Sequence, residues 1–263
     1  MWCAGNQLQY LVSRSFIKVL ICVLGVVNLQ AHAQSISVAA AANLNGVLEA
    51  IVQQYKKQTG VDIKLVYGSS GHFYQQITQG AKFDIFLSAN EEFVDRLVTQ
   101  GVSSSSGVVY ARGRLVVLVS KKSKIRPSAD MQDIKQALGD GRLTKFAIAN
   151  PALAPYGLAA KQSLEQLGLA QFIQPRLVLG GDVGQTMLFI KSEAAQAGMV
   201  PWSMIKTTPN LKEEEYFLIP EKLHQPILQK MLLFKDANSQ ARLFYEYLQT
   251  EKTRTIWRQY GYE

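Results

Sequence analysis

One local pattern recurs along most of this chain of 263 residues. A short apolar or β-branched run is followed by a tight loop of small residues and then by apolar residues at helical spacing. The first copy begins at Ile36, and its helical stripe ends at Gly60. Strands that lead directly into helices are typical of α/β folds. The pattern therefore predicts an α/β protein, with Asn43 as the N-cap of the first helix.

Later copies of the pattern predict further strands along the chain. The predicted strands cover 61–67, 83–88, 114–119, 146–149, 177–179, 198–201 and 227–234. The run 114–119 is continuously apolar, as expected for a strand that is covered on both faces. With 48% hydrophobic and 18% charged residues, the chain can bury a sizeable core. Because it is longer than one compact domain usually is, two lobes are expected.

Residues 1–33 show the three-part pattern of a secretory signal. Arg14 and Lys18 precede the apolar run 19–27, and small residues just before Gln34 predict cleavage there. The apolar run is shorter than the ~18 to 20 residues that span a bilayer, which disfavours a membrane anchor. We therefore expect a secreted protein.

Both cysteines, Cys3 and Cys22, lie in this signal. The mature chain is then expected to have no disulfide, no cysteine metal site and no thiol nucleophile. Loss of Arg14 and Lys18 lowers the formal net charge from +8 to +6. A basic balance is compatible with nucleic-acid binding, but the Lys and Arg residues are scattered along helices and linkers and form no basic stripe. We expect no nucleic-acid partner.

Strand-to-helix junctions are the candidate places for chemistry, because open α/β sheets bind ligands outside the carboxyl ends of their strands. Four junctions have polar or aromatic residues: Asn43, Ser69-Ser70, Tyr156-Gly157 and Asp182-Val183. Each offers unpaired N–H groups at the positive end of a helix dipole, and none of these loops contains Lys or Arg. Such a site suits a fully ionised oxyanion held by neutral donors. Asp182 is interpreted as an ordinary N-cap, since a carboxylate would repel the anion.

Catalytic motifs find little support in the sequence. The segment 203–206 fits S-x-x-K, but the companion elements of that motif are absent, as are G-x-S-x-G and the phosphate-binding GxxxxGK[ST] loop. His72 and His224 lack metal-ligand spacing. We expect no enzyme activity and no cofactor, with an exported serine hydrolase as the alternative of a different class.

Seven short motifs occur in the order found in periplasmic molybdate-binding proteins of ABC transporters, and the mature chain resembles this family over its whole length. The motifs are VAAAANL (38–44), YGSSG (67–71), FDIFLSA (83–89), GRLV (113–116), NP (150–151), APYG (154–157) and DV (182–183). The resemblance implies the type II periplasmic-binding-protein fold, with two α/β lobes joined by two hinge strands and a ligand cleft between them. The implied lobes are 34–112 plus 227–263, and 113–226.

The resemblance also implies the ligand and the residues that bind it. Carried over by position, the oxyanion-binding residues are Asn43, Ser70, Tyr156 and Val183, the last through its backbone N–H, with Ala42 and Ser69 as additional candidates. Molybdenum would be held as molybdate through these residues, without direct metal ligands. Ala42 stands where some relatives have threonine, and Pro201 stands near a tyrosine of another branch.

The implied protein is a monomer that captures molybdate or tungstate and delivers it to an ABC transporter permease. The alternative within the binding class is a receptor for sulfate, phosphate or ferric iron on the same fold. Iron would require clustered tyrosines and carboxylates, which the four junctions do not supply.

Overall fold

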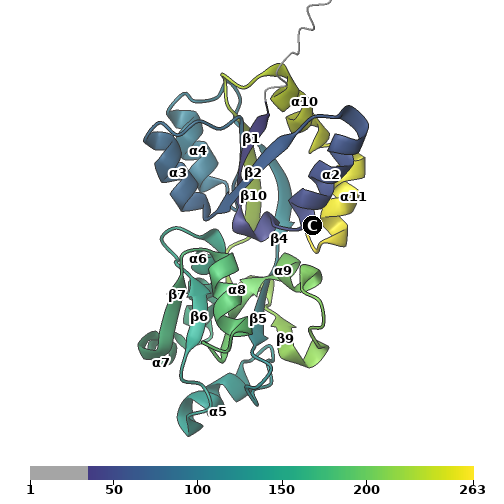
Figure 1. Cartoon of the computed structure of the whole chain (residues 1–263). Helices are drawn as coiled ribbons and strands as arrows, with labels where there is room; N and C mark the ends of the chain where they lie inside the picture. The colour runs from purple at the N-terminus through teal and green to yellow at the C-terminus, as the bar shows by residue number, and fades with distance from the viewer. Residues whose placement is uncertain (1–34) are drawn as a thin grey trace, which may run out of the picture. The chain divides into compact units, whose positions relative to one another are not determined.

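The computed structural model describes residues 35–263, which form two five-stranded sheets flanked by helices (Figure 1). The predicted signal over 1–33 lies outside the described residues. Within residues 35–263, no helix combines the length and the apolar character that a membrane crossing needs.

The first sheet has the strand order β2-β1-β3-β10-β4. Its strands are β1 Ile36–Ala41, β2 Ile63–Gly68, β3 Ile85–Leu87, β4 Val108–Gly113 and β10 Ile227–Leu233. Strands β2 and β3 run parallel to β1, whereas β10 runs antiparallel to both of its neighbours. The helices that accompany this sheet are η1 Ala42–Leu44, α2 Val47–Thr59, α3 Ser70–Thr78, α4 Glu92–Thr99, α10 Ser239–Tyr247 and α11 Glu251–Gln259.

The second sheet has the order β7-β6-β8-β5-β9. Its strands are β5 Leu115–Val119, β6 Phe146–Ala149, β7 Leu177–Gly180, β8 Ala197–Pro201 and β9 Tyr216–Leu218. Its helices are α5 Gln132–Asp140, α6 Pro155–Gln166, α7 Ala170–Ile173, η2 Gln174–Arg176, α8 Val183–Lys191, α9 Trp202–Thr207, η3 Glu213–Glu215 and η4 Glu221–Leu223. Every residue of β5, β6 and β8 is buried, which explains their unbroken apolar sequences.

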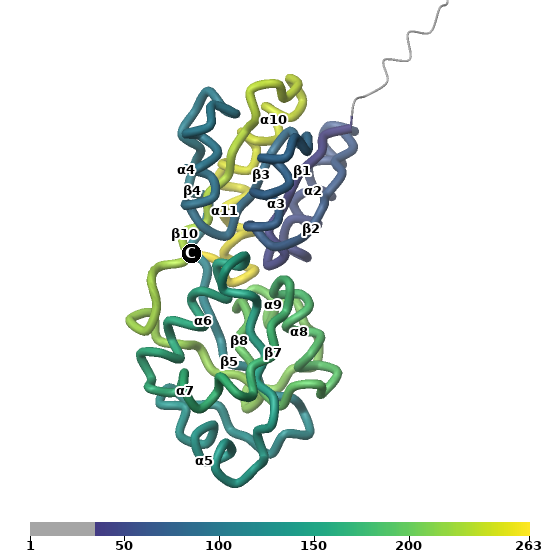
Figure 2. Tube along the Cα trace, turned by 90° about the vertical axis from the view of Figure 1, so that its left-hand side faces the viewer, coloured from purple at the N-terminus to yellow at the C-terminus, as the bar shows by residue number. Residues whose placement is uncertain are grey.

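The chain passes between the two sheets twice, and Figure 2 follows this path. Arg114 separates β4 of the first sheet from β5 of the second, and the segment 219–226 leads from β9 back to β10. The expected fold class, with two α/β lobes, is confirmed. Of the two expected hinge strands, the first is β4 and β5 on either side of Arg114, whereas the second crossing, 219–226, contains the short helix η4 and no strand. Each sheet, together with the helices given for it above, is called a lobe: the first sheet forms the first lobe and the second sheet the second.

Three sequence expectations differ from the structure. Asn43 is not the N-cap of α2, because its buried side chain is bonded elsewhere and α2 starts at Val47 after Gly46. The apolar residues Ala241, Phe244, Tyr245, Leu248 and Trp257 predict a single C-terminal helix. The structure has two helices there, because the Thr250 side chain accepts a hydrogen bond from the Thr253 N–H and caps a second one. Strand β4 was not expected, and its first residues, Val108 and Val109, are exposed at the edge of the sheet.

Candidate functional site

Each lobe contains one pair of parallel strands whose carboxyl ends lead into helices. In the first lobe β1 leads into η1 and β2 into α3, and in the second β6 leads towards α6 and β7 into α8. These four ends line one small pocket, and it includes all six positions named from the sequence: Ala42, Asn43, Ser69, Ser70, Tyr156 and Val183. The structure thus brings the six together, and their role in binding stays a prediction.

Ser69 and Ser70 present hydroxyl groups at the start of α3. The Ser69 Oγ accepts a hydrogen bond from the His72 N–H at 3.3 Å and so caps the helix. The Ser70 Oγ, which is buried, accepts from the Ala89 N–H at 2.9 Å. Since a hydroxyl has one proton as well as two lone pairs, Ser70 keeps its O–H for donation to a ligand.

The start of α8 offers backbone donors. Asp182 is its N-cap, as expected, and the Asp182 Oδ1 accepts from the Gln185 N–H at 2.9 Å. Val183 and Gly184 are the first two residues of the helix, where N–H groups have no intrahelical acceptor. The N–H of the buried Val183 is therefore without an acceptor in its own helix, and its role as a donor to a ligand stays a prediction.

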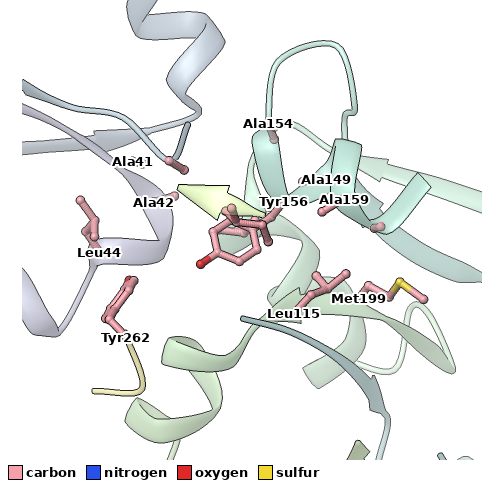
Figure 3. Close-up of a cluster of buried hydrophobic side chains, with 14 of the residues drawn as sticks. Ala41, Ala42, Leu44, Leu115, Ala149, Ala154, Tyr156, Ala159, Met199 and Tyr262 are labelled. Atoms are coloured by element: carbon pink, nitrogen blue, oxygen red, sulfur yellow. The ribbon is translucent and has the colours of Figure 1, made fainter. Parts of the chain in front are cut away.

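Tyr156 is both buried and part of the pocket lining. Pro155 begins α6, and the Tyr156 side chain is 2% exposed. Figure 3 shows its ring in the space between Ala42 and Leu115, which belong to different lobes. Burial, reinforced by the neighbouring Tyr262, holds the pKa of the Tyr156 phenol well above its usual range. The phenol therefore keeps its proton at neutral pH and can donate it.

Gly157 lets α6 start directly against the end of β6. A Cβ at this position would lie 2.1 Å from the Ala149 carbonyl oxygen. Only glycine fits this approach, so Gly157 fixes where the preceding Tyr156 stands relative to the sheet.

The Asn43 side chain has no amide proton left for a ligand. Asn43 is 1% exposed, and its Nδ2 donates to the Gln229 Oε1 and to the Tyr262 hydroxyl, both at 2.9 Å. Both of its side-chain protons are therefore engaged. The donor left for a ligand is the Asn43 backbone N–H, at the second position of η1.

Sequence reasoning missed Gln229 and Tyr262 as neighbours of the site. One signal was available for Gln229, because it shares the inward face of β10 with the buried Ile227, Met231 and Leu233. A glutamine on such an apolar face needs polar partners in the core. Tyr262, near the end of the chain, gave no such signal.

Charged groups are nearly absent from the pocket. No Lys or Arg lines it, and Asp182 is its one carboxylate. A larger cavity of about 520 Å³ between α4 and α6 is lined by three carboxylates, Glu91, Glu92 and Asp95, against one cation, Arg96, which is paired with Glu92, so this cavity disfavours an anion. Within residues 35–263, no group of three or more His, Cys, Asp or Glu residues could hold a metal ion. The donors described above suit an anion that is bound by neutral groups.

Residues 36–263 match the family model of the bacterial extracellular solute-binding proteins. The chain belongs to this family. The molybdate-binding protein ModA of Azotobacter vinelandii is 31% identical over 242 residues, which cover 90% of this chain and 93% of that protein. ModA of Rhodobacter capsulatus is 32% identical over 237 residues, which cover 89% and 90%.

A solved structure agrees with these relatives. The Azotobacter vinelandii periplasmic molybdate-binding protein aligns with a TM-score of 0.79 at 32% identity, over 87% of this chain and 99% of that one. The sulfate-binding protein SubI of Mycobacterium tuberculosis aligns with a TM-score of 0.67 at 15% identity, which shows a shared fold alone.

Hydrogen bonds join the two lobes of this solute-binding protein around the pocket. The Gly71 N–H donates to the Leu153 carbonyl at 2.8 Å, and the Ser203 Oγ donates to the Asn43 carbonyl at 3.0 Å. Gln229 of the first lobe donates to the hydroxyl of Tyr156 in the second at 3.1 Å. The pocket therefore lies where the lobes meet, and both lobes supply its donors.

Proposed function

We propose that this protein binds molybdate or tungstate in the pocket between its lobes and delivers the anion to the permease of an ABC transporter. The names of the relatives at about 30% identity support the ligand, and they match this chain over nearly its full described length. The donors in the pocket support an anion of this kind independently of those names.

One observation carries the proposal: the pocket is built from neutral donors at helix N-termini. Ser70, Tyr156 and Val183 lie in the first turns of α3, α6 and α8. Each helix N-terminus stabilises a nearby anion by about 0.3–1 kcal/mol when exposed, and by up to about 2 kcal/mol when partly buried. All oxygens of a tetrahedral dianion without a proton are acceptors, so each of them can accept from these donors. No hydrogen of the ligand then points at a donor of the protein.

The proposed function includes export of the protein and closure of its two lobes on the anion. The signal over 1–33 directs export and is cleaved before Gln34, and the mature protein is a periplasmic monomer that works without a cofactor and without enzyme activity. The lobes, 34–112 plus 227–263 and 113–226, close on the anion by bending at their two connecting segments. Closure removes water, and the lower local dielectric strengthens the hydrogen bonds to the ligand.

Asp182 favours hydrogen phosphate as a second candidate ligand. Its carboxylate lines the pocket, and an anion that carries a proton needs an acceptor there. The Asp182 Oδ1 also accepts from the Gln185 N–H and so caps α8, which leaves the other acceptor sites of the carboxylate for the proton of such a ligand.

Thermal unfolding of the mature protein with each anion tests the proposed function. Molybdate or tungstate at about 100 times its Kd should add about 2.7 kcal/mol to the free energy of unfolding. For a chain of this size that is a rise in Tm of roughly 5–11 °C. Millimolar sulfate and phosphate should have little effect. A shift with phosphate alone would favour the second candidate, and no response to molybdate or tungstate would contradict the proposal.

A further inference from the structure

Gln229 connects two residues of the pocket although it does not line the pocket itself. It is fully buried in β10, at the point where the register with β4 shifts. Its Oε1 accepts from the Asn43 Nδ2 at 2.9 Å and from the Tyr110 hydroxyl at 3.0 Å. Its Nε2 donates to the Tyr156 hydroxyl at 3.1 Å. The direction of this amide therefore decides whether Tyr156 accepts or donates.

A backbone carbonyl fixes that direction. The hydroxyl of Tyr262 and the carbonyl oxygen of Asn43 lie 2.7 Å apart, and a carbonyl can only accept, so the phenol proton lies between them. The Tyr262 oxygen can then only accept from the Asn43 side chain, which must present its Nδ2. Amide orientations are assigned in this way, from the partners that surround them.

The direction of the Asn43 amide fixes the direction of the Gln229 amide, and this in turn fixes the role of the Tyr156 hydroxyl. The Asn43 Nδ2 that faces Tyr262 also faces Gln229, so Gln229 must present its Oε1 there. Its Nε2 is left for Tyr156, whose oxygen accepts. The proton of Tyr110 faces two acceptors, the Gln229 Oε1 and the Ser88 carbonyl, and is compatible with this direction. The Tyr156 proton is thus free for a ligand.

We propose that Gln229 is a positioning residue, oriented by Tyr262 through Asn43, which holds the Tyr156 hydroxyl as a donor towards the ligand and so selects oxyanions that carry no proton. This inference rests on the proposed function of the pocket. With the amide reversed, Tyr156 would donate to Gln229 and present a lone pair to the ligand. That lone pair would oppose the oxygen of a dianion but would accept the proton of hydrogen phosphate.

The variant Gln229→Glu reverses the last hydrogen bond while it keeps the acceptor for Asn43 and Tyr110. The introduced carboxylate accepts a hydrogen bond from the Tyr156 hydroxyl, which then no longer donates to the ligand. The Kd for molybdate should therefore rise by about 10- to 150-fold, the range for a hydrogen bond to a charged group. The preference for molybdate over phosphate should fall at the same time. Burial raises the pKa of such a carboxyl, so the loss should grow between pH 6 and 9 as it ionises.

A double-mutant cycle with Tyr156→Phe separates orientation from simple charge repulsion. Repulsion between the introduced carboxylate and the anion is the same whether or not residue 156 has a hydroxyl. Orientation has an effect only where the hydroxyl is present. Gln229→Glu should therefore raise the Kd several-fold less in the Tyr156→Phe background than in the wild type.

Tyr262→Phe tests the start of the chain of contacts without any added charge. Without the phenol, the amides of Asn43 and Gln229 lose their fixed direction, and the Kd for molybdate should rise by about 2- to 10-fold, with a lower preference over phosphate. Tyr245→Phe is the matched control, because that buried phenol donates to the Met231 carbonyl, outside the pocket lining. It should leave affinity and preference unchanged.

The outcomes distinguish this inference from the proposed function. If the wild type binds molybdate and both Gln229→Glu and Tyr262→Phe keep its affinity and preference, the positioning role is overturned while the function stands. Equal losses from Gln229→Glu in the two backgrounds of the cycle also overturn it. If the wild type binds neither molybdate nor tungstate, the function fails and the inference fails with it.

Discussion

Ser70 is the side chain whose contribution to binding can be isolated best. Its hydroxyl accepts from the Ala89 N–H and has one proton left for the ligand. Ser70→Ala removes that donor, so the Kd for molybdate should rise by about 10- to 150-fold, as expected for a hydrogen bond to an anion. Isothermal titration calorimetry measures this change directly.

Ser163→Ala is the matched control for this variant. Ser163 is fully buried in α6, the helix that also contains Tyr156, but its Oγ donates to the Ala159 carbonyl of the same helix. Its loss should leave the affinity unchanged. Ser203 is unsuitable as a control, because it bonds to the carbonyl of Asn43. Equal changes in the Kd for molybdate from Ser70→Ala and Ser163→Ala would contradict the placement of the ligand beside Ser70.

The residues predicted from the sequence differ from the missed ones in how far along the chain their partners lie. Ser70, Tyr156 and Val183 lie at strand-to-helix junctions, which are local features of a sequence, and the family resemblance selects them there. Gln229 and Tyr262 lie 186 and 219 residues from Asn43, which they contact. Their approach depends on β10 entering the first sheet antiparallel between β3 and β4, and no local pattern shows that order.

The elements missed by sequence reasoning have weak local signals. Strand β9 is three residues long and pairs with β5 alone, so its apolar residues, Tyr216 to Leu218, are too few to show a strand period. Helix α5 starts after Met131, a residue with positive φ that makes no side-chain cap. Asp130 accepts from the Gln132 N–H instead. The strands β1, β5 and β8 were found because they are buried on both faces.

The N-terminus of α3 also controls how closely the lobes approach. A Cβ on Gly71 would lie 2.8 Å from the Leu153 Cα and carbonyl oxygen of the other lobe. Gly71→Ala should therefore oppose closure, with overpacking worth about 1–3 kcal/mol. We expect the Kd for molybdate to rise by roughly 5- to 150-fold in calorimetry. The Tm of the ligand-free protein should fall less than the affinity does, because the proposed open form loses the clash with Leu153 and keeps only the 3.1 Å approach to the Phe93 Cζ of the same lobe.

Gly139→Ala provides the comparison for this change. Gly139 lies within α5, and a Cβ there would have no atom within 4 Å. The substitution should add about 0.5–1 kcal/mol of stability through helix propensity and leave the affinity unchanged. An unchanged affinity for Gly71→Ala as well would contradict the role of close lobe contact in binding.

The net positive charge of the whole chain is separate from the chemistry of the pocket. The formal net charge is +8, yet no Lys or Arg lines the pocket. A second cavity, of about 270 Å³, is lined by Arg112, Arg254 and Arg258. These arginines are paired with Glu221 or Glu251, so an anion there would compete with existing ion pairs. We expect helix dipoles and neutral donors, and not this basic cluster, to hold the ligand.

The anomalous scattering of tungsten in crystals of the mature protein grown with tungstate tests this central claim most directly. The account predicts one strong peak, within hydrogen-bonding reach of the Ser70 and Tyr156 hydroxyls and of the Val183 N–H. A peak beside Arg112, Arg254 and Arg258, with none in the pocket between the lobes, would contradict it.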